Sequence, residues 1–200
     1  MTERLGLIVT DASPLITLGA ARALSCLTVA GVPVFIPDMI YAEVTQDMAR
    51  LGAEEVVEWV RAHLGQVQIV PTRVFADYQA LQSINPKTRS KGRGEQSALE
   101  VLGFEIAANE ELHAVLLFED NDIQAREFVR ALPERVTALS TGDLLHELEA
   151  AGLIQSSDHI LDEAAARGRN VEQQLQPVAA KPARALLREQ LRRDRPKSGE

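Results

Sequence analysis

Short apolar runs alternate with helical patterns along most of this chain. Five of these runs are predicted to form strands, at 7–9, at the start of 34–48, at 66–70, at 114–118 and in a run that ends at 140–141. Helical patterns, in which apolar residues recur every three or four positions, lie between the strands. This alternation favours an α/β fold with a mainly parallel central sheet.

The stretch LLFEDNDIQAR, at 116–126, carries the densest candidate chemistry. Its apolar run ends at Glu119, Asp120 and Asp122, so the predicted strand delivers carboxylates to its carboxyl end. Parallel sheets bind ligands outside the carboxyl ends of their strands, at the point where the strand order reverses. These acids are therefore a candidate metal site, and the alternative interpretation is a solvated turn between strand and helix.

The first strand also leads to an acid. Asp11 lies between that strand and a helix that Ser13 is expected to cap, with Pro14 in the first helical position. A carboxylate there lies at the top of the sheet, within reach of Asp120. The alternative role for Asp11 is that of a helix-entry acid favoured by the helix dipole. The helix is expected to end at about Leu27.

Two further acids fall on helix faces that should turn inward. Glu43 lies between Ile40 and Val44 on such a face, and Glu95 falls within the apolar stripe of GEQSALEVLGFEIAAN. A carboxylate on an apolar stripe costs desolvation free energy unless a cation or a donor meets it. Both are candidate site residues. For Glu95 the alternative is a first-turn acid favoured by the helix dipole.

A basic loop lies in the middle of the chain. The segment NPKTRSKGRG, at 85–94, carries positive charges at alternate positions: Lys87, Arg89, Lys91 and Arg93. These side chains are predicted to guide phosphate groups towards the acids. The alternative is a solvated connection between two helices.

Two hydroxyl residues, Ser140 and Thr141, stand where the last strand meets the next helix. They are expected to cap that helix, and the alternative is contact with a metal-bound water. The four histidines show no ligand spacing, which disfavours zinc. The sequence contains neither a P-loop nor a nucleophile elbow.

Composition limits the remaining possibilities. The chain has 200 residues, of which 46% are hydrophobic, enough for one globular domain with a sizeable core. The net charge of -8 argues against a general polyanion-binding surface, although a small phosphate site that uses metal ions stays compatible with it. A single cysteine, no secretory signal and no long apolar span favour a cytoplasmic protein with no membrane partner.

The C-terminal segment differs from the rest in charge. Residues 1–168 are predicted to form the domain, and 169–200 a basic linker with a short helix. Leu187 and Leu191 give this helix a narrow apolar edge, so we expect it to be mobile unless it docks on the acidic core, a second copy or another protein. Deletion of 178–200 is accordingly expected to leave the melting temperature largely unchanged.

Five stretches of the sequence occur in the order of a known family. They are VTDASPLITL, IPDMIYAEV, GRGEQSALEVL, LLFEDNDIQAR and ALSTGDLLHELEAAGLI, and they span about 6–154. Through them the chain resembles the PIN-domain proteins, in particular the VapC-type toxin ribonucleases and their uncharacterised relatives. The resemblance implies a three-layer α/β/α fold and a four-acid endoribonuclease site that uses Mg²⁺ or Mn²⁺. Glu119 departs from the family pattern, in which many members carry Asp or Asn.

The chemistry of phosphodiester hydrolysis gives each acid an expected role. Asp11 and Asp120 would be the main direct metal ligands. Glu95 and Asp122 would be direct or water-mediated ligands, and Glu43 would orient a metal-bound water. The expected partners are an RNA substrate, a small antitoxin protein and a second copy of the chain in a homodimer.

Two alternatives stay open. One is a non-catalytic PIN-like module that binds RNA or a protein. The other is a phosphohydrolase on a doubly wound sheet, which would favour a second Asp two residues after Asp11, where Ser13 stands. A metal-dependent RNA cleavage assay with an active-site variant distinguishes the three functions.

Overall fold

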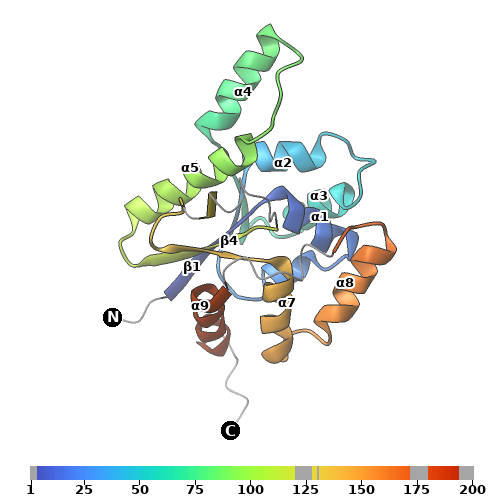
Figure 1. The fold of residues 1–200 in the computed structure, drawn as a ribbon, viewed down its shortest axis with the longest axis vertical. Coiled ribbons are helices and arrows are strands. Elements are labelled where there is room, and N and C mark those ends of the chain that lie inside the picture. Colours follow the sequence, from blue (N-terminus) through green and yellow to red (C-terminus); the bar gives the residue numbers. More distant parts are fainter. Residues whose placement is uncertain (1–3, 120–127, 130, 172–179, 194–200) are drawn as a thin grey trace.

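The centre of the molecule is a parallel sheet. The computed structural model describes residues 4–119, 128–129, 131–171 and 180–193. Within this part of the chain, five strands form one sheet: β1 (Arg4–Thr10), β2 (Val34–Pro37), β3 (Val67–Val70), β4 (Leu112–Leu117) and β5 (Val136–Leu139). All neighbouring strands are parallel, in the order β3-β2-β1-β4-β5. The predicted α/β fold with a mainly parallel sheet is confirmed (Figure 1).

The strand order reverses between β1 and β4. The register of these two strands pairs Thr10 with Leu117, so both strands end at the same edge of the sheet. Val9 and Leu116 are completely buried, as expected for a parallel sheet that is covered on both faces. The residues that follow β1 and β4 therefore lie side by side, where open α/β sheets form their ligand sites.

Helices cover both faces of the sheet. Their bounds are α1 (Ala12–Ala20), η1 (Leu24–Leu27), α2 (Asp38–Thr45), α3 (Ala53–Ala62), α4 (Arg73–Ile84), α5 (Arg93–Ala108), α7 (Thr141–Ala150), α8 (Ser157–Ala166) and α9 (Ala180–Arg193). α5 packs on β1, β2 and β4, and α9 packs on β1 and β5. Figure 1 shows α5 above the strands and α7 and α9 below them, which confirms the three-layer α/β/α arrangement. None of the described helices has the length and apolar character that a membrane crossing requires.

α1 is shorter than the sequence analysis expected, because a turn closes it at Ala20. The N–H of Arg22 donates to the Gly19 carbonyl at 2.9 Å, and the N–H of Ala23 donates to the Leu18 carbonyl at 2.8 Å. Arg22 has a left-handed φ of 55°. The residue that adopts this conformation at the C-terminal end of a helix is usually glycine. The next residues up to Leu27 form the 3₁₀ helix η1 instead of continuing α1.

The C-terminal helix α9 docks on the acidic core. Leu187 and Leu191 are buried in the same hydrophobic cluster as the sheet residues. Arg184 pairs with the buried Asp143 of α7, and Arg188 pairs with Glu147 one turn further along α7. The partners are four residues apart on both helices, so the two ion pairs lie one helical turn apart along the same interface. Of the arrangements considered for this segment, the structure shows docking on the core.

Candidate active site

Asp11 lies where the chain leaves β1. It is the N-cap residue of α1, yet its side chain makes no capping hydrogen bond. Its backbone N–H donates to the Leu117 carbonyl oxygen at 3.0 Å, which ties Asp11 to the end of β4. The partly buried carboxylate therefore stands at the carboxyl edge of the sheet, where the strand order reverses.

Asp11 and Glu43 approach each other beside Gly94. Glu43 lies on α2, and Gly94 is in the first turn of α5. A Cβ atom on Gly94 would lie 3.8 Å from Oδ1 of Asp11 and also 3.8 Å from Oε2 of Glu43. Both carboxylates thus border the same small space, and glycine at position 94 leaves that space open.

Crowding and burial perturb the proton affinity of Asp11. Burial is the largest cause that raises its pKa from 3.8 to about 7. The negative charges of Glu95, Glu43 and Glu119 raise the pKa further, and a hydrogen bond from the Ala12 backbone opposes them. Three carboxylates from three other elements of the chain therefore act on Asp11 at once.

The same environment affects Glu43. Burial raises the pKa of Glu43, the nearby Arg50 lowers it, and the charge of Glu95 raises it again. Asp11, Glu43 and Glu95 therefore form a carboxylate cluster in which negative charge exceeds the positive charge close by. A bound divalent cation would relieve this repulsion more effectively than any single side chain.

The remaining predicted ligands, Asp120 and Asp122, lie outside the described residues. β4 ends at Leu117, so the chain leads directly from the sheet edge towards them. Among the residues that the structure describes, no three acidic, histidine or cysteine side chains are close enough to hold a metal ion. The metal site assigned to Asp11, Glu95, Asp120 and Asp122 thus stays a prediction.

Glu119, the departure from the family pattern, is the centre of a buried polar network. Only 3% of its surface is exposed. Thr17 of α1 donates to its Oε2 at 3.2 Å, Thr141 of α7 donates to its Oε1, and Arg169 donates to Oε2 at 3.3 Å. Burial raises the pKa of Glu119, although Thr141 and Arg169 counteract the shift. Its side chain thus connects α1, α7 and the segment after α8.

Thr17 and Arg169, which no sequence pattern had indicated, belong to this network. Arg169 also donates to the Thr17 hydroxyl at 2.9 Å and to the Ser13 carbonyl oxygen at 3.3 Å. Thr17 and Arg169 are 152 residues apart, and no spacing pattern in a single sequence connects them. The one available signal was Glu119 itself, an acid at the end of a long apolar run.

Two of the supporting hydroxyl residues have roles other than those predicted. Ser13 is not the cap of α1, because the helix begins at Ala12 and Asp11 is its N-cap. Pro14 is tolerated one turn into the helix since the first N–H groups have no partner within it. Ser140 does cap α7, accepting from the N–H of Asp143 at 3.0 Å, whereas the Thr141 hydroxyl binds Glu119.

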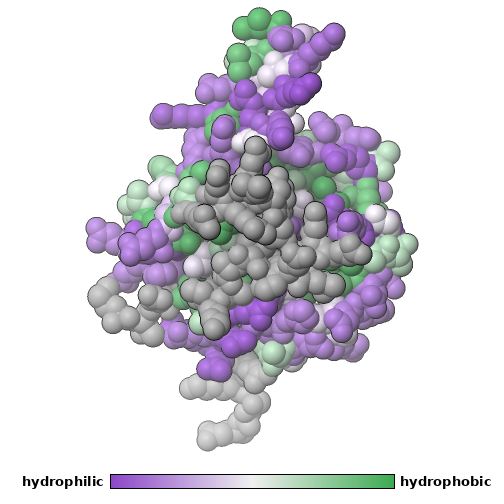
Figure 2. Space-filling view, viewed as in Figure 1, coloured by the Kyte–Doolittle hydropathy of each residue, from purple (hydrophilic) through white to green (hydrophobic). Residues whose placement is uncertain are grey.

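The basic loop lies between α4 and α5. Lys87, Arg89 and Lys91 are exposed, as a role in guiding phosphates requires. Arg93 differs, because it is the first residue of α5 and its guanidinium lies over the Tyr78 ring, 5.3 Å from the ring centroid. Figure 2 shows this upper projection of the molecule with hydrophilic residues beside a hydrophobic group at its tip.

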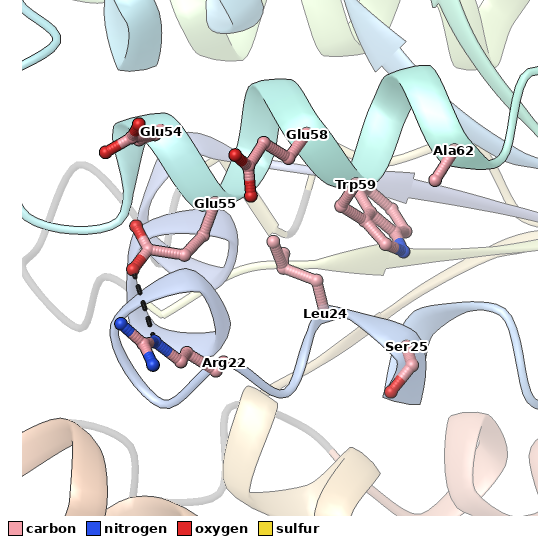
Figure 3. A pocket seen from close by; sticks show the side chains of 8 residues that line it. All are labelled: Arg22, Leu24, Ser25, Glu54, Glu55, Glu58, Trp59 and Ala62. Carbon is pink, nitrogen blue, oxygen red and sulfur yellow. Dashed lines mark ion pairs between the residues drawn. The ribbon is translucent and has the colours of Figure 1, made fainter.

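A separate cavity of about 690 Å³ lies away from the carboxylate cluster. Figure 3 shows Glu54, Glu55 and Glu58 of α3 on one side of it and Arg22 on the other, with Arg22 and Glu55 joined as an ion pair at 3.7 Å. None of the predicted catalytic residues lines this cavity. We therefore do not place the active site there.

The fold and the carboxylates define a class: α/β proteins with acids at the strand reversal of a parallel sheet. A family model described as DUF3368, a PIN domain, matches residues 7–179. The chain belongs to this PIN-domain family, whose members are generally nucleases. No curated protein and no solved structure is significantly similar to it.

The donor atoms of the carboxylate cluster are of the type that a hard divalent cation favours, although these three acids alone do not come close enough together to hold one. Asp11, Glu43 and Glu95 supply only carboxylate oxygens, the donors that Mg²⁺ and Mn²⁺ favour. Burial is the main cause that raises the pKa of Asp11, and the negative charges of the neighbouring carboxylates add to it. A metal ion here would need further ligands, and the predicted ones, Asp120 and Asp122, lie outside the described residues.

Proposed function

We propose that this protein is a metal-dependent endoribonuclease. Its active site, formed by Asp11, Glu43, Glu95 and Asp120, hydrolyses RNA phosphodiester bonds. One observation carries the proposal: Asp11, directly after β1, lies at the strand reversal with carboxylates from α2 and α5, and burial together with their negative charge raises the pKa of Asp11 to about 7. Such an arrangement costs folding free energy and contributes nothing to packing. A catalytic role accounts for it.

In this proposal Asp11, Glu95, Asp120 and Asp122 would hold Mg²⁺ or Mn²⁺, which when bound would supply charge stabilisation for the reacting phosphate and activation of the attacking water. Glu43 orients that water, and its raised pKa suits a group that accepts a proton during the attack. The first turn of α5, where Gly94 leaves space, favours negative charge through the helix dipole and helps to bind the phosphate.

The basic loop supports RNA as the substrate. Lys87, Arg89 and Lys91 precede α5, which carries Glu95, so a strand that follows these charges leads towards the carboxylates. A phosphohydrolase acting on small phosphate esters has no use for such an extended basic segment. It would also favour a second Asp close behind Asp11, where the chain has Ala12 and Ser13.

The experiment is an RNA cleavage assay with the wild-type protein and Asp11→Asn. The wild type should cleave single-stranded RNA with Mg²⁺ or Mn²⁺ and stop when EDTA is added. Asp11→Asn should reduce the rate by about 10²-fold or more, in line with losses of metal-site residues. Asp162→Asn, on an exposed position of α8, is the matched control and should cleave at the wild-type rate.

Two results would contradict the proposal. RNA binding without cleavage at any divalent cation would make the protein a non-catalytic RNA-binding module. Hydrolysis of small phosphate esters but not of RNA would make it a phosphohydrolase.

The toxin role is a narrower prediction from the family resemblance. Expression of the wild type should arrest bacterial growth, whereas expression of Asp11→Asn should not. Co-expression of a small antitoxin protein encoded by a neighbouring gene should restore growth. The homodimer is tested by the mass of the purified protein in solution.

A further inference from the structure

A cleft of about 200 Å³ lies between α2 and α4, next to the carboxylate cluster. Its lining includes Glu43 of α2, Gln46 directly after that helix, and Phe75, Tyr78, Gln79 and Gln82 of α4. The four residues of α4 are spaced i, i+3, i+4 and i+7, so they share one face of the helix. Glu43 belongs to both the cleft and the carboxylate cluster, and the two are therefore continuous.

This face of α4 lines the cleft and does not pack on a hydrophobic core. None of its residues is buried, and Figure 1 shows the helix projecting from the body of the molecule. Phe75 and Tyr78 remain partly exposed, and Gln79 and Gln82 are exposed. A helical face with this spacing normally packs on a core. Here it stays accessible to a ligand.

The aromatic residues offer a stacking surface. The rings of Phe75 and Tyr78 are inclined by 24°, with centroids 6.5 Å apart. The guanidinium of Arg93 already lies 5.3 Å from the Tyr78 centroid, so a planar polar group can reach this ring. Proteins bind single-stranded nucleic acids by stacking unpaired bases on such rings.

The amide side chains offer edge contacts. Gln46, Gln79 and Gln82 each carry donors and an acceptor, which suits hydrogen bonding to the edge of a nucleobase. Gln82 donates to the Tyr78 hydroxyl at 3.1 Å, which links one amide to the stacking surface. The volume is below the roughly 300–1,000 Å³ of pockets for drug-sized ligands and suits one base better than a larger molecule.

We propose that this cleft is a subsite for one unstacked base of the RNA, next to the phosphate that is cleaved. Phe75 and Tyr78 form the stacking wall, and Gln46, Gln79 and Gln82 contact the edge of the base. The proposal rests on the proposed nuclease function, because it is Glu43 that joins the cleft to the catalytic carboxylates. It assigns to α4 the selection of single-stranded substrate.

The first test measures binding without turnover. In the Asp11→Asn protein, a fluorescent single-stranded RNA is compared with an abasic ribose-phosphate oligomer of equal length and charge. Adding Tyr78→Leu should weaken RNA binding by about 5- to 150-fold, the range for loss of one base stack, and leave binding of the abasic oligomer unchanged. Tyr78→Phe keeps the ring and should bind RNA as the parent protein does.

The matched control is Phe104→Leu, which removes an aromatic ring that is 72% exposed on α5 and lies outside the cleft. It should not change RNA binding. Equal effects of Tyr78→Leu and Phe104→Leu would overturn the proposal, as would an equal loss for RNA and for the abasic oligomer. Unchanged RNA binding with an altered oligomeric mass would make the cleft a protein-docking surface, which also overturns it.

The second test separates this inference from the proposed function. With Mg²⁺, Tyr78→Leu should slow cleavage of RNA by the same factor and leave hydrolysis of a base-free phosphodiester at the wild-type rate. If the wild type cleaves neither substrate, the nuclease function fails. The comparison of binding still decides whether the cleft holds a base.

Discussion

Arg169 donates a hydrogen bond to Glu119 at 3.3 Å, although 50 residues separate the two in sequence. The contact joins the segment after α8 to the carboxyl end of β4, directly before Asp120. Because Thr17 and Thr141 bind the same carboxylate, the position of this sheet edge depends on side chains from α1, α7 and the chain after α8.

Replacing Arg169 with Met should leave Glu119 as a buried charge without its cation. Loss of one partner of a buried ion pair costs about 3–5 kcal/mol, and chemical denaturation of the variant should show a free energy of unfolding lower by that amount. Arg167→Ala is the control, because Arg167 lies 4.0 Å from Glu55 and both side chains are partly exposed. That change should cost less than about 1 kcal/mol. Equal stability of the two variants would mean that the buried pair contributes little.

Asp11 should make the metal-free protein less stable as the pH rises. Its pKa is 3.8 in an unfolded chain and about 7 in the folded protein. Between these values only the folded state keeps the proton, so stability falls as the pH rises from about 4 to about 7 and stays lower above that. Asp11→Asn should therefore raise the melting temperature at pH 8 in EDTA, because it removes a destabilising contribution to the free energy of unfolding on the order of a few kcal/mol at most. At pH 4 the melting temperature should change little.

The exposed Asp162→Asn serves as the control for this comparison and should show no such pH dependence. An Asp11→Asn protein that melts at the wild-type temperature at both pH values would show that burial and the neighbouring carboxylates do not raise the pKa of Asp11 in the folded state.

Neutralising the basic loop should weaken RNA binding through its electrostatic part. The logarithm of the RNA association constant falls with the logarithm of the salt concentration, with a slope of about 0.7 for each phosphate contact with a single strand. Changing Lys87, Arg89 and Lys91 to Ala should therefore reduce the magnitude of this slope by about 2. Arg93 is left in place because it contacts Tyr78. Arg61→Ala, an exposed position on α3, is the control. A salt dependence equal to that of the control would reduce the loop to a solvated connection.

α9 should be required for full stability. Leu187 and Leu191 are buried, so deletion of 178–200 is now expected to lower the melting temperature and not to leave it largely unchanged. Leu187→Ala should lower the free energy of unfolding by about 2–5 kcal/mol, and deletion of the helix should lower it further. Arg193→Ala should have little effect, because Arg193 pairs with the exposed Glu189 on the same helix. A truncated protein that melts like the wild type would show that the fold does not need α9.

The sequence by itself determined the sheet and the origin of the carboxylate cluster. Apolar runs such as 114–117 are long enough to be buried on both faces, and acids at their ends can only emerge at the sheet edge. The helical period likewise indicated that Glu43 and Glu95 turn inward. These inferences succeed because periodicity and strand ends are local properties of the chain.

Only the tertiary structure decided which distant residues meet. The contacts of Glu119 with Thr17 and Arg169, and of α9 with α7, join segments that have no common sequence pattern. The end of α1 at Ala20 also depended on the turn at Arg22, a residue type that does not indicate a left-handed conformation. Such contacts arise from how packed elements share space, and that is a property of the folded chain as a whole.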